Sequence, residues 1–391
     1  MYPEISLAKG REQSVHRHHP WIFSGAIKSK THKLSDGEIV RVLDYAGNFL
    51  AVGIYQNGSI MVRILTKLDI EIDQNFWDEV ILNAYMYRTH TLLLPSKATN
   101  AYRLFHGEGD GVSGLVIDIY NKTAVIQCHN IGIYKMLDYI IEALKKKLPS
   151  ELQHIYVKSK ETLPDQEIEI KDGHYYGTET EEDIVSEYNL KFKVNWASGQ
   201  KTGFFLDQRE NRKLVGENAN GKSVLNCFCY TGGFSVYAAA NGATKVDSVD
   251  ISAKAMAITD ENILINRITN HQSHTANVLD FLSNHISSYD IVIVDPPAFA
   301  KSMSKRHNAV QAYKRLNILA MKVVKKGGLL FTFSCSQVVN TQLFYDTIVS
   351  AGIESGRKIR VMQHLSQGAD HPVHLFHPEG HYLKGLILYV E

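Results

Sequence analysis

The sequence predicts an α/β protein whose C-terminal half forms a Rossmann-like, mostly parallel sheet, preceded by a β-rich domain and a small α+β domain. Strand-like and helix-like runs alternate from about residue 188 onward, a pattern typical of a parallel sheet covered by helices on both faces. Residues 291–295 are an apolar run that ends in a carboxylate, as expected of a strand buried on both faces. Near the N-terminus, short alternating runs are separated by Gly and Asn, which favours a small barrel or sheet.

The N-terminal segment is expected to be a domain of short strands followed by one helix. Residues 38–44, 49–55 and 60–65 alternate between apolar and polar side chains, which is the two-residue period of a half-buried strand. Residues 76–94 have a helical pattern that stops before Pro95, because proline disfavours a helical conformation at the residue before it.

The middle segment is predicted to be a small α+β unit. Residues 115–120 and 123–128 read as strands around a turn, 134–148 as a helix and 154–158 as a further strand. The acidic, irregular stretch 161–183 is expected to be a surface turn or linker.

The C-terminal segment is predicted to place polar residues at one edge of its sheet. The expected strands are 224–227, 245–250, 291–295 and 329–334, and the expected helices are 232–240, 253–267 and 310–324. Ligands of such sheets bind at the carboxyl ends of the strands. The polar residues at these ends include Asn226, Asp250, Asp295 and Cys335.

Length and composition set limits on the class of protein. The 391 residues suggest three domains, at 1–72, 73–184 and 185–391. No apolar run approaches the roughly 18 residues of a membrane span, and four cysteines without a regular spacing fit a reduced, cytoplasmic environment. We expect no membrane association and no metal site, since no second Cys/His cluster accompanies Cys227 and Cys229.

The segment from 224 to 235 has the layout of a nucleotide-binding strand, turn and helix. Gly232 and Gly233 let the backbone pass close to a ligand, and the next strand ends in Asp250, which can accept hydrogen bonds from ribose hydroxyls. A NAD site would show GxGxxG in front of a pyrophosphate. S-adenosylmethionine (SAM) has no phosphate, so it tolerates a bulkier turn and is the expected cofactor. The predicted SAM contacts are Phe228, Tyr230, Thr231, Gly232, Gly233, Asp250 and Asn277, the last through the adenine edge.

Two strand ends carry the residues expected to perform chemistry. Asp295-Pro296-Pro297 follows a buried strand, and the two prolines stiffen the chain so that Asp295 can face a planar base. Cys335 follows the apolar run 329–334; a free cysteine is often a core residue, but this one lies beyond the run. A thiolate that adds to C6 of cytosine activates C5 for methylation. We therefore predict Cys335, Asp295 and Pro296 as catalytic residues.

Basic residues at the two ends of the chain are the predicted RNA contacts. The N-terminal and C-terminal segments have net positive charge, whereas the middle is acidic. Lys9, Arg11 and Arg17 are candidates for phosphate contacts in the first segment, and Arg209 and Arg212 beside the SAM site.

Several motifs taken together resemble the RlmI family of 23S rRNA 5-methylcytosine methyltransferases. They are Lys9-Gly-Arg11, His19-Pro-Trp-Ile-Phe-Ser-Gly25, Lys201-Thr-Gly-Phe-Phe-Leu-Asp-Gln-Arg209, Cys229-Tyr-Thr-Gly-Gly-Phe234, Asp295-Pro-Pro297, Ser334-Cys-Ser336, Ala369-Asp-His-Pro-Val373 and Pro378-Glu-Gly380. The resemblance covers essentially the whole chain.

This resemblance implies an N-terminal PUA domain, a central α+β domain, a C-terminal class I SAM methyltransferase domain and 23S rRNA as the substrate. It leaves open whether the chain forms a homodimer. Many RNA 5-methylcytosine enzymes carry a second cysteine directly after Pro-Pro, where this chain has Ala298, as RlmI-like sequences do. The base is therefore open among Asp295, His371, Glu379, Lys384 and water.

Two other functions are compatible with much of the same pattern. A methyltransferase of this architecture that acts on a guanine ring nitrogen needs no covalent activation, so Cys335 favours cytosine C5. A non-catalytic RNA-binding scaffold on a degenerate methyltransferase is disfavoured by the intact Gly232-Gly233, Asp250 and Asp295-Pro-Pro297.

Overall fold

The computed structural model describes residues 2–163, 168–300 and 302–391. The chain divides into two compact units, and each contains segments that are distant in sequence. Unit 1 comprises residues 1–185, 194–204 and 369–380, and unit 2 comprises 186–193, 205–368 and 381–391. This division differs from the three contiguous domains expected from the sequence, because segments 194–204 and 369–380 pack with unit 1.

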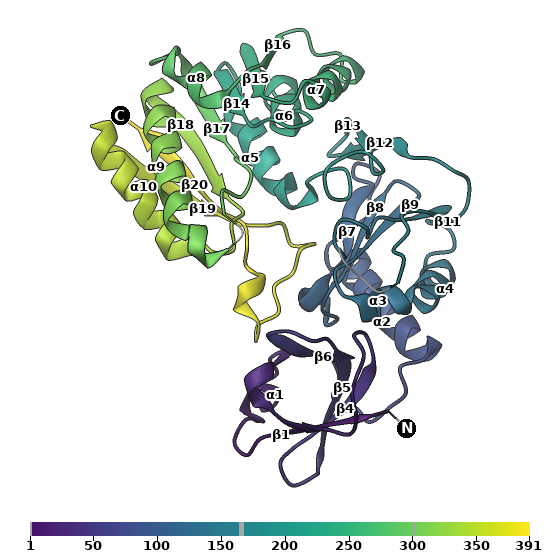
Figure 1. The fold of residues 1–391 in the computed structure, drawn as a ribbon. Coiled ribbons are helices and arrows are strands. Elements are labelled where there is room, and N and C mark those ends of the chain that lie inside the picture. The colour runs from purple at the N-terminus through teal and green to yellow at the C-terminus, as the bar shows by residue number, and fades with distance from the viewer. Residues whose placement is uncertain (1, 164–167, 301) are drawn as a thin grey trace. The chain divides into compact units, whose positions relative to one another are not determined.

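Unit 1 begins with a six-stranded sheet in the order β2-β6-β5-β4-β1-β3 (Figure 1). The strands are β1 (Glu4–Leu7), β2 (Trp21–Phe23), β3 (Ile27–Lys30), β4 (Ile39–Leu43), β5 (Phe49–Tyr55) and β6 (Ile60–Thr66), with short helices α1 (Gln13–His16) and η1 (Ser24–Ala26). Alternate side chains such as Val40 and Val42 are fully buried in its core. The three strands predicted in this region are confirmed as β4, β5 and β6.

The second part of unit 1 is a five-stranded sheet, β11-β10-β9-β8-β7, covered by helices. Its elements are α2 (Gln74–Met86), η2 (Tyr87–Thr91), β7 (Ala101–His106), η3 (Gly107–Asp110), β8 (Leu115–Tyr120), β9 (Thr123–Cys128), α3 (Ile131–Lys135), α4 (Leu137–Lys147), β10 (His154–Val157) and β11 (Gly173–Tyr176). Its core also includes Val52 and Ile54 of β5. The two sheets of unit 1 therefore share one hydrophobic cluster.

The structure corrects two expectations for this region. The stretch 161–183 is not only a linker, since it contains β11, which pairs antiparallel with β10; residues 164–167 of the stretch lie outside the described residues. The helix expected at 76–94 begins earlier, where Asp73 accepts a 3.1 Å hydrogen bond from the Phe76 amide, and α2 ends at Met86 before the wider turn η2. The spacing of apolar residues does not indicate the N-cap at Asp73 or the change from α2 to the wider turn η2.

A buried ion-pair network ties segment 369–380 to the rest of unit 1. The guanidinium of Arg88, which is fully buried, pairs with Asp110 and donates a 2.8 Å hydrogen bond to the Asp370 carbonyl. The Asp370 carboxylate accepts a 3.0 Å hydrogen bond from the Arg103 amide, and Arg103 pairs in turn with buried Asp118. Because buried charges are stable only when they are paired, this network accounts for the position of the segment.

Unit 2 is built on a seven-stranded sheet in the order β16-β15-β14-β17-β18-β20-β19, which is parallel from β16 to β18, while β20 is antiparallel to both of its neighbours. The strands are β14 (Ser223–Cys227), β15 (Lys245–Asp250), β16 (His271–Thr275), β17 (Tyr289–Val294), β18 (Val324–Ser334), β19 (Ile359–Leu365) and β20 (Lys384–Val390). The helices are η4 (Leu206–Gln208), α5 (Arg209–Asn218), α6 (Gly233–Ala240), α7 (Ala253–Ile265), α8 (Val278–Ser283), η5 (Met303–Lys305), α9 (Arg306–Val323) and α10 (Thr341–Ser355). A hairpin of β12 (Glu182–Glu187) and β13 (Leu190–Asn195) precedes the sheet, and η6 (Pro378–Gly380) lies in segment 369–380.

Strand β17 shows why this sheet reads as continuous apolar runs. Ile291 and Ile293 pack into the cluster under α5 and α6, whereas Val292 and Val294 pack into the cluster under α8, α9 and α10. Helices therefore cover both faces of the sheet (Figure 1), and all four side chains are essentially buried. The predicted parallel sheet with two covered faces is confirmed.

Candidate active site at the carboxyl ends of the strands

The loop from β14 to α6 has an unusual backbone. Phe228 (φ 57°), Tyr230 (φ 48°) and Gly232 (φ 78°) all lie in the left-handed region, where residues other than glycine are uncommon. A Cβ on Gly232 would lie 2.6 Å from Thr259 Cγ2, so glycine is also required there for space. Strain of this kind is typical of functional loops that the surrounding structure holds in place.

Asp250, at the end of β15, fixes this loop. One of its carboxylate oxygens accepts a 3.1 Å hydrogen bond from the Tyr230 amide, and the other a 2.9 Å hydrogen bond from the Ser252 amide. Each oxygen retains a second lone pair. The structure therefore brings Asp250 and the predicted glycine loop together at the carboxyl ends of β14 and β15.

The remaining predicted cofactor residues have structural roles that the sequence did not reveal. The Thr231 carbonyl accepts a 2.8 Å hydrogen bond from the Asn262 side chain, and a Cβ on Gly233 would lie 2.9 Å from Arg212 Cδ. Asn277 caps α8, because its side-chain oxygen accepts hydrogen bonds from the amides of Leu279 (2.9 Å) and Asp280 (3.3 Å). The oxygen of Asn277 is thus engaged by the helix, in the usual manner of an N-cap.

Asp295 lies directly after β17, and Gln208 holds its carboxylate. The Gln208 side-chain amide donates a 2.9 Å hydrogen bond to Asp295, and the Asn211 amide donates a 2.6 Å hydrogen bond to the Gln208 oxygen. Pro296 is buried and Pro297 is exposed. Gln208 was not among the predicted site residues, although it directly precedes Arg209, which the sequence indicated as lying beside the SAM site.

Cys335 follows the last residue of β18 and is partly exposed. Ser334 of β18 pairs with Lys384 of β20, so the lysine begins the neighbouring strand at the same edge. The Lys384 ammonium donates 2.7 Å hydrogen bonds to the carbonyls of Ser336 and Tyr382. Burial lowers the pKa of Lys384 to about 8, and the charge of the Cys335 thiolate partly opposes this shift. The arrangement places a cation beside the thiol.

The four side-chain candidates for the base separate between the units. Asp295 and Lys384 belong to unit 2, together with Cys335. His371 and Glu379 belong to unit 1, where His371 is buried 3.1 Å from Asp370 and Glu379 contacts His377. Within unit 2, Asp295 and Lys384 are thus the two side chains from this set.

Arg209 and Arg212 do not match their predicted role as RNA contacts. Both are buried, and Arg212 forms two hydrogen bonds of 2.8 and 2.7 Å with the carboxylate of buried Glu187. Arg212 also donates a 2.8 Å hydrogen bond to the Phe205 carbonyl, so it ties Glu187 and Phe205 to α5. We correct the prediction, because arginines in this state are not accessible to a phosphate.

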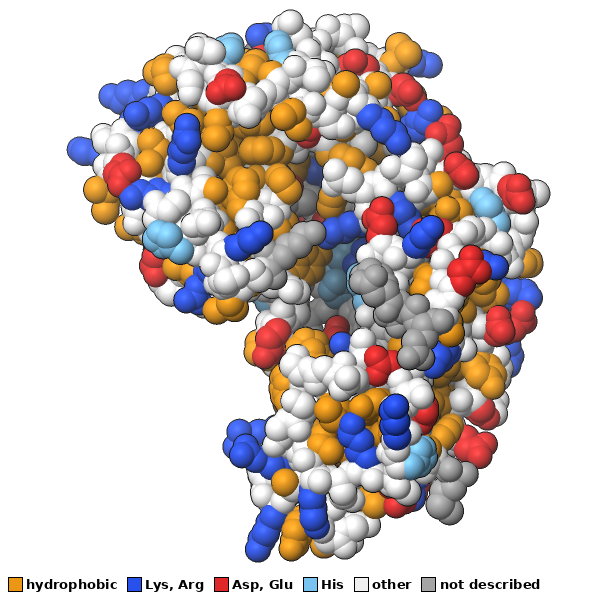
Figure 2. Space-filling view, in the orientation of Figure 1, with side chains coloured by type: hydrophobic (Ala, Val, Ile, Leu, Met, Phe, Trp, Pro, Cys, Tyr) orange, Lys and Arg blue, Asp and Glu red, His pale blue; other side chains and the backbone are white. Residues whose placement is uncertain are grey.

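The RNA contacts predicted in the N-terminal segment are exposed, in contrast to the two buried arginines. Lys9, Arg11 and Arg17 are all exposed, and Figure 2 shows Lys and Arg side chains on the lower part of the view, over the six-stranded sheet. Phe23 is 46% exposed, whereas the Trp21 indole donates hydrogen bonds to Glu108 (3.0 Å) and Ser113 (3.1 Å). Trp21 is therefore a packing residue, and Phe23 is the aromatic side chain available for stacking.

The sheet order, the glycine loop and Asp250 define the class of protein, a SAM-dependent methyltransferase with the class I fold. Residues 140–354 match the S-adenosylmethionine-dependent methyltransferase family, and residues 5–67 match the PUA-like domain family.

No helix among the described residues is long and apolar enough to cross a membrane.

Curated relatives identify the family. The chain is 36% identical over 401 residues to the ribosomal RNA large subunit methyltransferase I of Tolumonas auensis, and 36% identical over 398 residues to that of Pseudoalteromonas atlantica. Each alignment covers 99% of both chains. The chain therefore belongs to the ribosomal RNA large subunit methyltransferase I family.

Solved structures agree with the fold. A SAM-dependent methyltransferase from Streptococcus mutans is 25% identical, covers 99% of this chain and 100% of its own, and has a TM-score of 0.85; a second structure with the same values is complexed with SAH. The tRNA m1G37 methyltransferase of M. jannaschii is 15% identical with a TM-score of 0.50 over 88% of this chain and 89% of its own, and shows the fold alone. Because the fold also serves an enzyme named for a guanine, the fold does not select the base.

The residues present fit SAM. A carboxylate at the end of the second strand suits ribose hydroxyls, and the buried Thr231 hydroxyl and Asn226 side-chain oxygen have no hydrogen-bond partner among the described residues. Asp250 would hold the ribose, and the loop of Phe228, Tyr230 and Gly232 would lie against the cofactor.

We predict that Asp250→Ala weakens SAM binding at least tenfold, since a hydrogen bond to a charged group contributes about 1.5–3 kcal/mol. Calorimetric titration with SAM measures the effect, and thermal unfolding shows whether the domain remains folded. Asp260→Ala is the matched control, because Asp260 is an exposed carboxylate on the following helix. Equal SAM affinity of the Asp250→Ala and wild-type proteins would remove Asp250 from the site.

Proposed function

We propose that this protein methylates C5 of a specific cytosine in 23S rRNA, using SAM and a transient covalent bond between Cys335 and C6 of the base. The observation that carries the proposal is the pair of Cys335 and Lys384 at the carboxyl end of β18, on the sheet edge that also bears Asp295 and Asp250. Membership of the ribosomal RNA large subunit methyltransferase I family supports rRNA as the substrate.

The chemistry follows from the weak nucleophilicity of cytosine C5. The Cys335 thiolate adds to C6, which gives C5 enamine character. SAM supplies the methyl group, so that the new C5–CH₃ bond forms as SAH leaves. A base then removes the C5 proton, the C6–S bond breaks, and the thiolate returns with 5-methylcytosine as the product.

Lys384 has a role in this scheme because the reactive form of cysteine is the thiolate. Its ammonium donates to the carbonyls of Ser336 and Tyr382, and its third N–H could donate to the thiolate. Asp295, whose carboxylate is held by Gln208, would contact the cytosine ring. The cytosine itself must leave its stack to reach this edge, which costs a few kcal/mol.

The N-terminal domain is the proposed site for RNA backbone contacts. Its PUA-like match and the exposed Lys9, Arg11 and Arg17 support this assignment. Deleting the domain would be a poor test, because β5 contributes Val52 and Ile54 to the core of the second sheet. Surface variants leave that core intact.

We predict that Cys335→Ala binds SAM normally and transfers essentially no methyl group, because C5 is then not activated. RNA containing 5-fluorocytosine should form a covalent adduct with the wild-type enzyme and none with Cys335→Ala, since the fluorine cannot leave as a proton. Cys128→Ala, which changes a buried cysteine in unit 1, should keep the adduct. Substantial methyl transfer by folded Cys335→Ala would instead favour a ring nitrogen as the target.

We predict that Lys384→Met shifts the pH dependence of Cys335 alkylation by iodoacetamide to higher pH and lowers methyl transfer at pH 7 at least tenfold. Lys384→Arg should restore much of both, because it returns the positive charge. With a pKa of about 8, Lys384 of the wild-type enzyme is mostly charged below pH 8 and loses its charge above it. An unchanged alkylation profile in Lys384→Met would leave the lysine with a packing role only.

We predict that Lys9→Ala/Arg11→Ala/Arg17→Ala reduces RNA affinity and flattens its salt dependence. Each phosphate contact contributes about 0.7 to the magnitude of the slope of log K against log salt, so the loss of three contacts should decrease that magnitude by about 2. Lys97→Ala/Lys122→Ala/Lys160→Ala is a control with the same change in charge at three exposed lysines of unit 1. Identical slopes for the two triple variants would show that the N-terminal residues make no specific phosphate contacts.

A further inference from the structure

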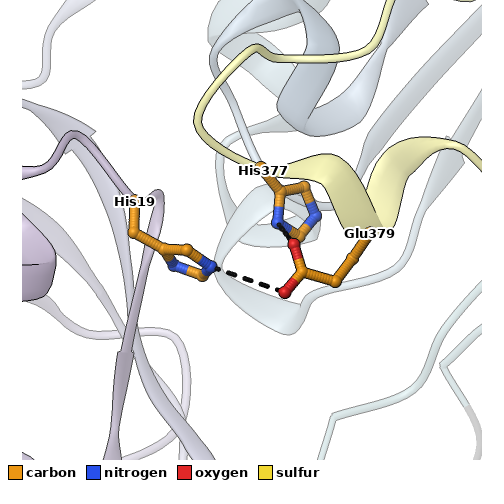
Figure 3. A group of neighbouring side chains, drawn as sticks. All are labelled: His19, His377 and Glu379. Atoms are coloured by element: carbon orange, nitrogen blue, oxygen red, sulfur yellow. Dashed lines mark ion pairs between the residues drawn. The ribbon is translucent and has the colours of Figure 1, made fainter.

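A second group of polar side chains lies in unit 1, whereas the residues of the proposed reaction belong to unit 2. His19, next to β2, meets His377 and Glu379 of segment 369–380 (Figure 3). One ligand atom from each of the three lies within 4.8 Å of the others. Two imidazoles and one carboxylate are a ligand set that zinc and similar divalent ions accept.

His377 is the buried member of this cluster. Its side chain is 3% exposed, and within the part of the chain that the structure describes Nδ1 has no hydrogen-bond partner of acceptable geometry, even though it lies 3.0 Å from Glu379 Oε2. The ring packs edge-on against Trp21, with 4.3 Å between the ring centroids. A buried ring nitrogen without a hydrogen bond carries a cost, and a metal ion would remove that cost.

His19 is also oriented by its surroundings. Its Nδ1 lies 3.3 Å from the Trp21 carbonyl oxygen and 3.1 Å from the Trp21 amide nitrogen, while Nε2 faces Glu379 at 4.0 Å. The Trp21 amide donates to Nδ1 in the tautomer that carries its proton on Nε2. A metal ion at Nε2 selects the other tautomer, in which Nδ1 donates to the Trp21 carbonyl, the arrangement common in metal-binding histidines. The preceding residue, His18, has a φ of 62°, so the backbone is strained at this position.

Glu379 can complete the site by a small movement. Its side chain is 58% exposed, so its rotation meets little resistance. Ligand atoms about 2.0–2.1 Å from a tetrahedral zinc lie about 3.3 Å apart, and the 4.0 Å between His19 Nε2 and Glu379 Oε1 must therefore shorten by less than about 1 Å. Water would take the fourth position.

We propose that His19, His377 and Glu379 bind one divalent cation of the zinc type, and that this ion fastens segment 369–380 to β2 within unit 1. This site is independent of the methylation proposal. It departs from the expectation of no metal site, which considered cysteine spacing and not two histidines that are distant in the sequence.

The test is titration of chelator-treated protein with Zn²⁺ by calorimetry, and with Co²⁺ by visible absorption. We expect one Zn²⁺ per chain, a rise in Tm on Zn²⁺ addition, and Co²⁺ d–d bands of four- or five-coordinate N/O ligation. Glu379→Gln should weaken binding at least tenfold, and His377→Phe should abolish it. His32→Ala is the control, because His32 lies 3.9 Å from Glu38 without belonging to the cluster.

The outcomes separate cleanly because Glu379→Gln alters only an exposed side chain and is safe for folding even if His377→Phe is not. Absence of Zn²⁺ binding to the wild-type protein would overturn the proposal. So would Zn²⁺ binding that is unchanged in Glu379→Gln, or that is lost equally in His32→Ala, since either result would mean adventitious binding to the other histidines.

Discussion

A parallel sheet with both faces buried is the constraint on which the chemistry of unit 2 depends. Strands β14, β15, β17 and β18 run in the same direction, and both of their faces are occupied by apolar packing. Polar residues within the strands, such as Asp247 and Ser248 of β15, are hydrogen-bonded inside the core, so the polar groups that can meet a ligand are those at the strand ends. The carboxyl ends gather Asp250, Asp295 and Cys335 at one edge although the chain separates them by up to 85 residues, and no separate device is required to bring them together.

Side chains behind this edge keep it in place. Gln208 holds Asp295, Asn262 and Thr259 hold the glycine loop, and the Arg212–Glu187 pair fixes the approach to α5. Several of these residues are polar and buried, and each has its hydrogen-bond partner within unit 2. Groups that must hold a geometry to within a fraction of an ångström are typically supported in this way.

The sequence was informative wherever periodicity or a strand end decides the structure, as for β4, β5, β6, β17 and the edge of the large sheet. The sequence was misleading where the role of a side chain depends on its interaction partner in the folded protein. Arg212 is a residue type that often contacts phosphate, but here it forms a buried ion pair with Glu187, 25 residues earlier. Asn277 could equally contact adenine or cap a helix, and the pattern of α8 did not reveal the cap. Neither β11 nor the meeting of His19 with His377 leaves a local signal, because both depend on distant partners.

The position of segment 369–380 has a consequence for synthesis on the ribosome. The guanidinium of Arg88 donates a hydrogen bond to the Asp370 carbonyl, which lies 282 residues later in the sequence. The Arg103 amide donates to the Asp370 carboxylate, 267 residues later. Unit 1 therefore cannot satisfy these buried donors while its own N-terminal portion is emerging. It must wait in an incomplete state until Asp370 has been translated, so its final consolidation comes late in synthesis.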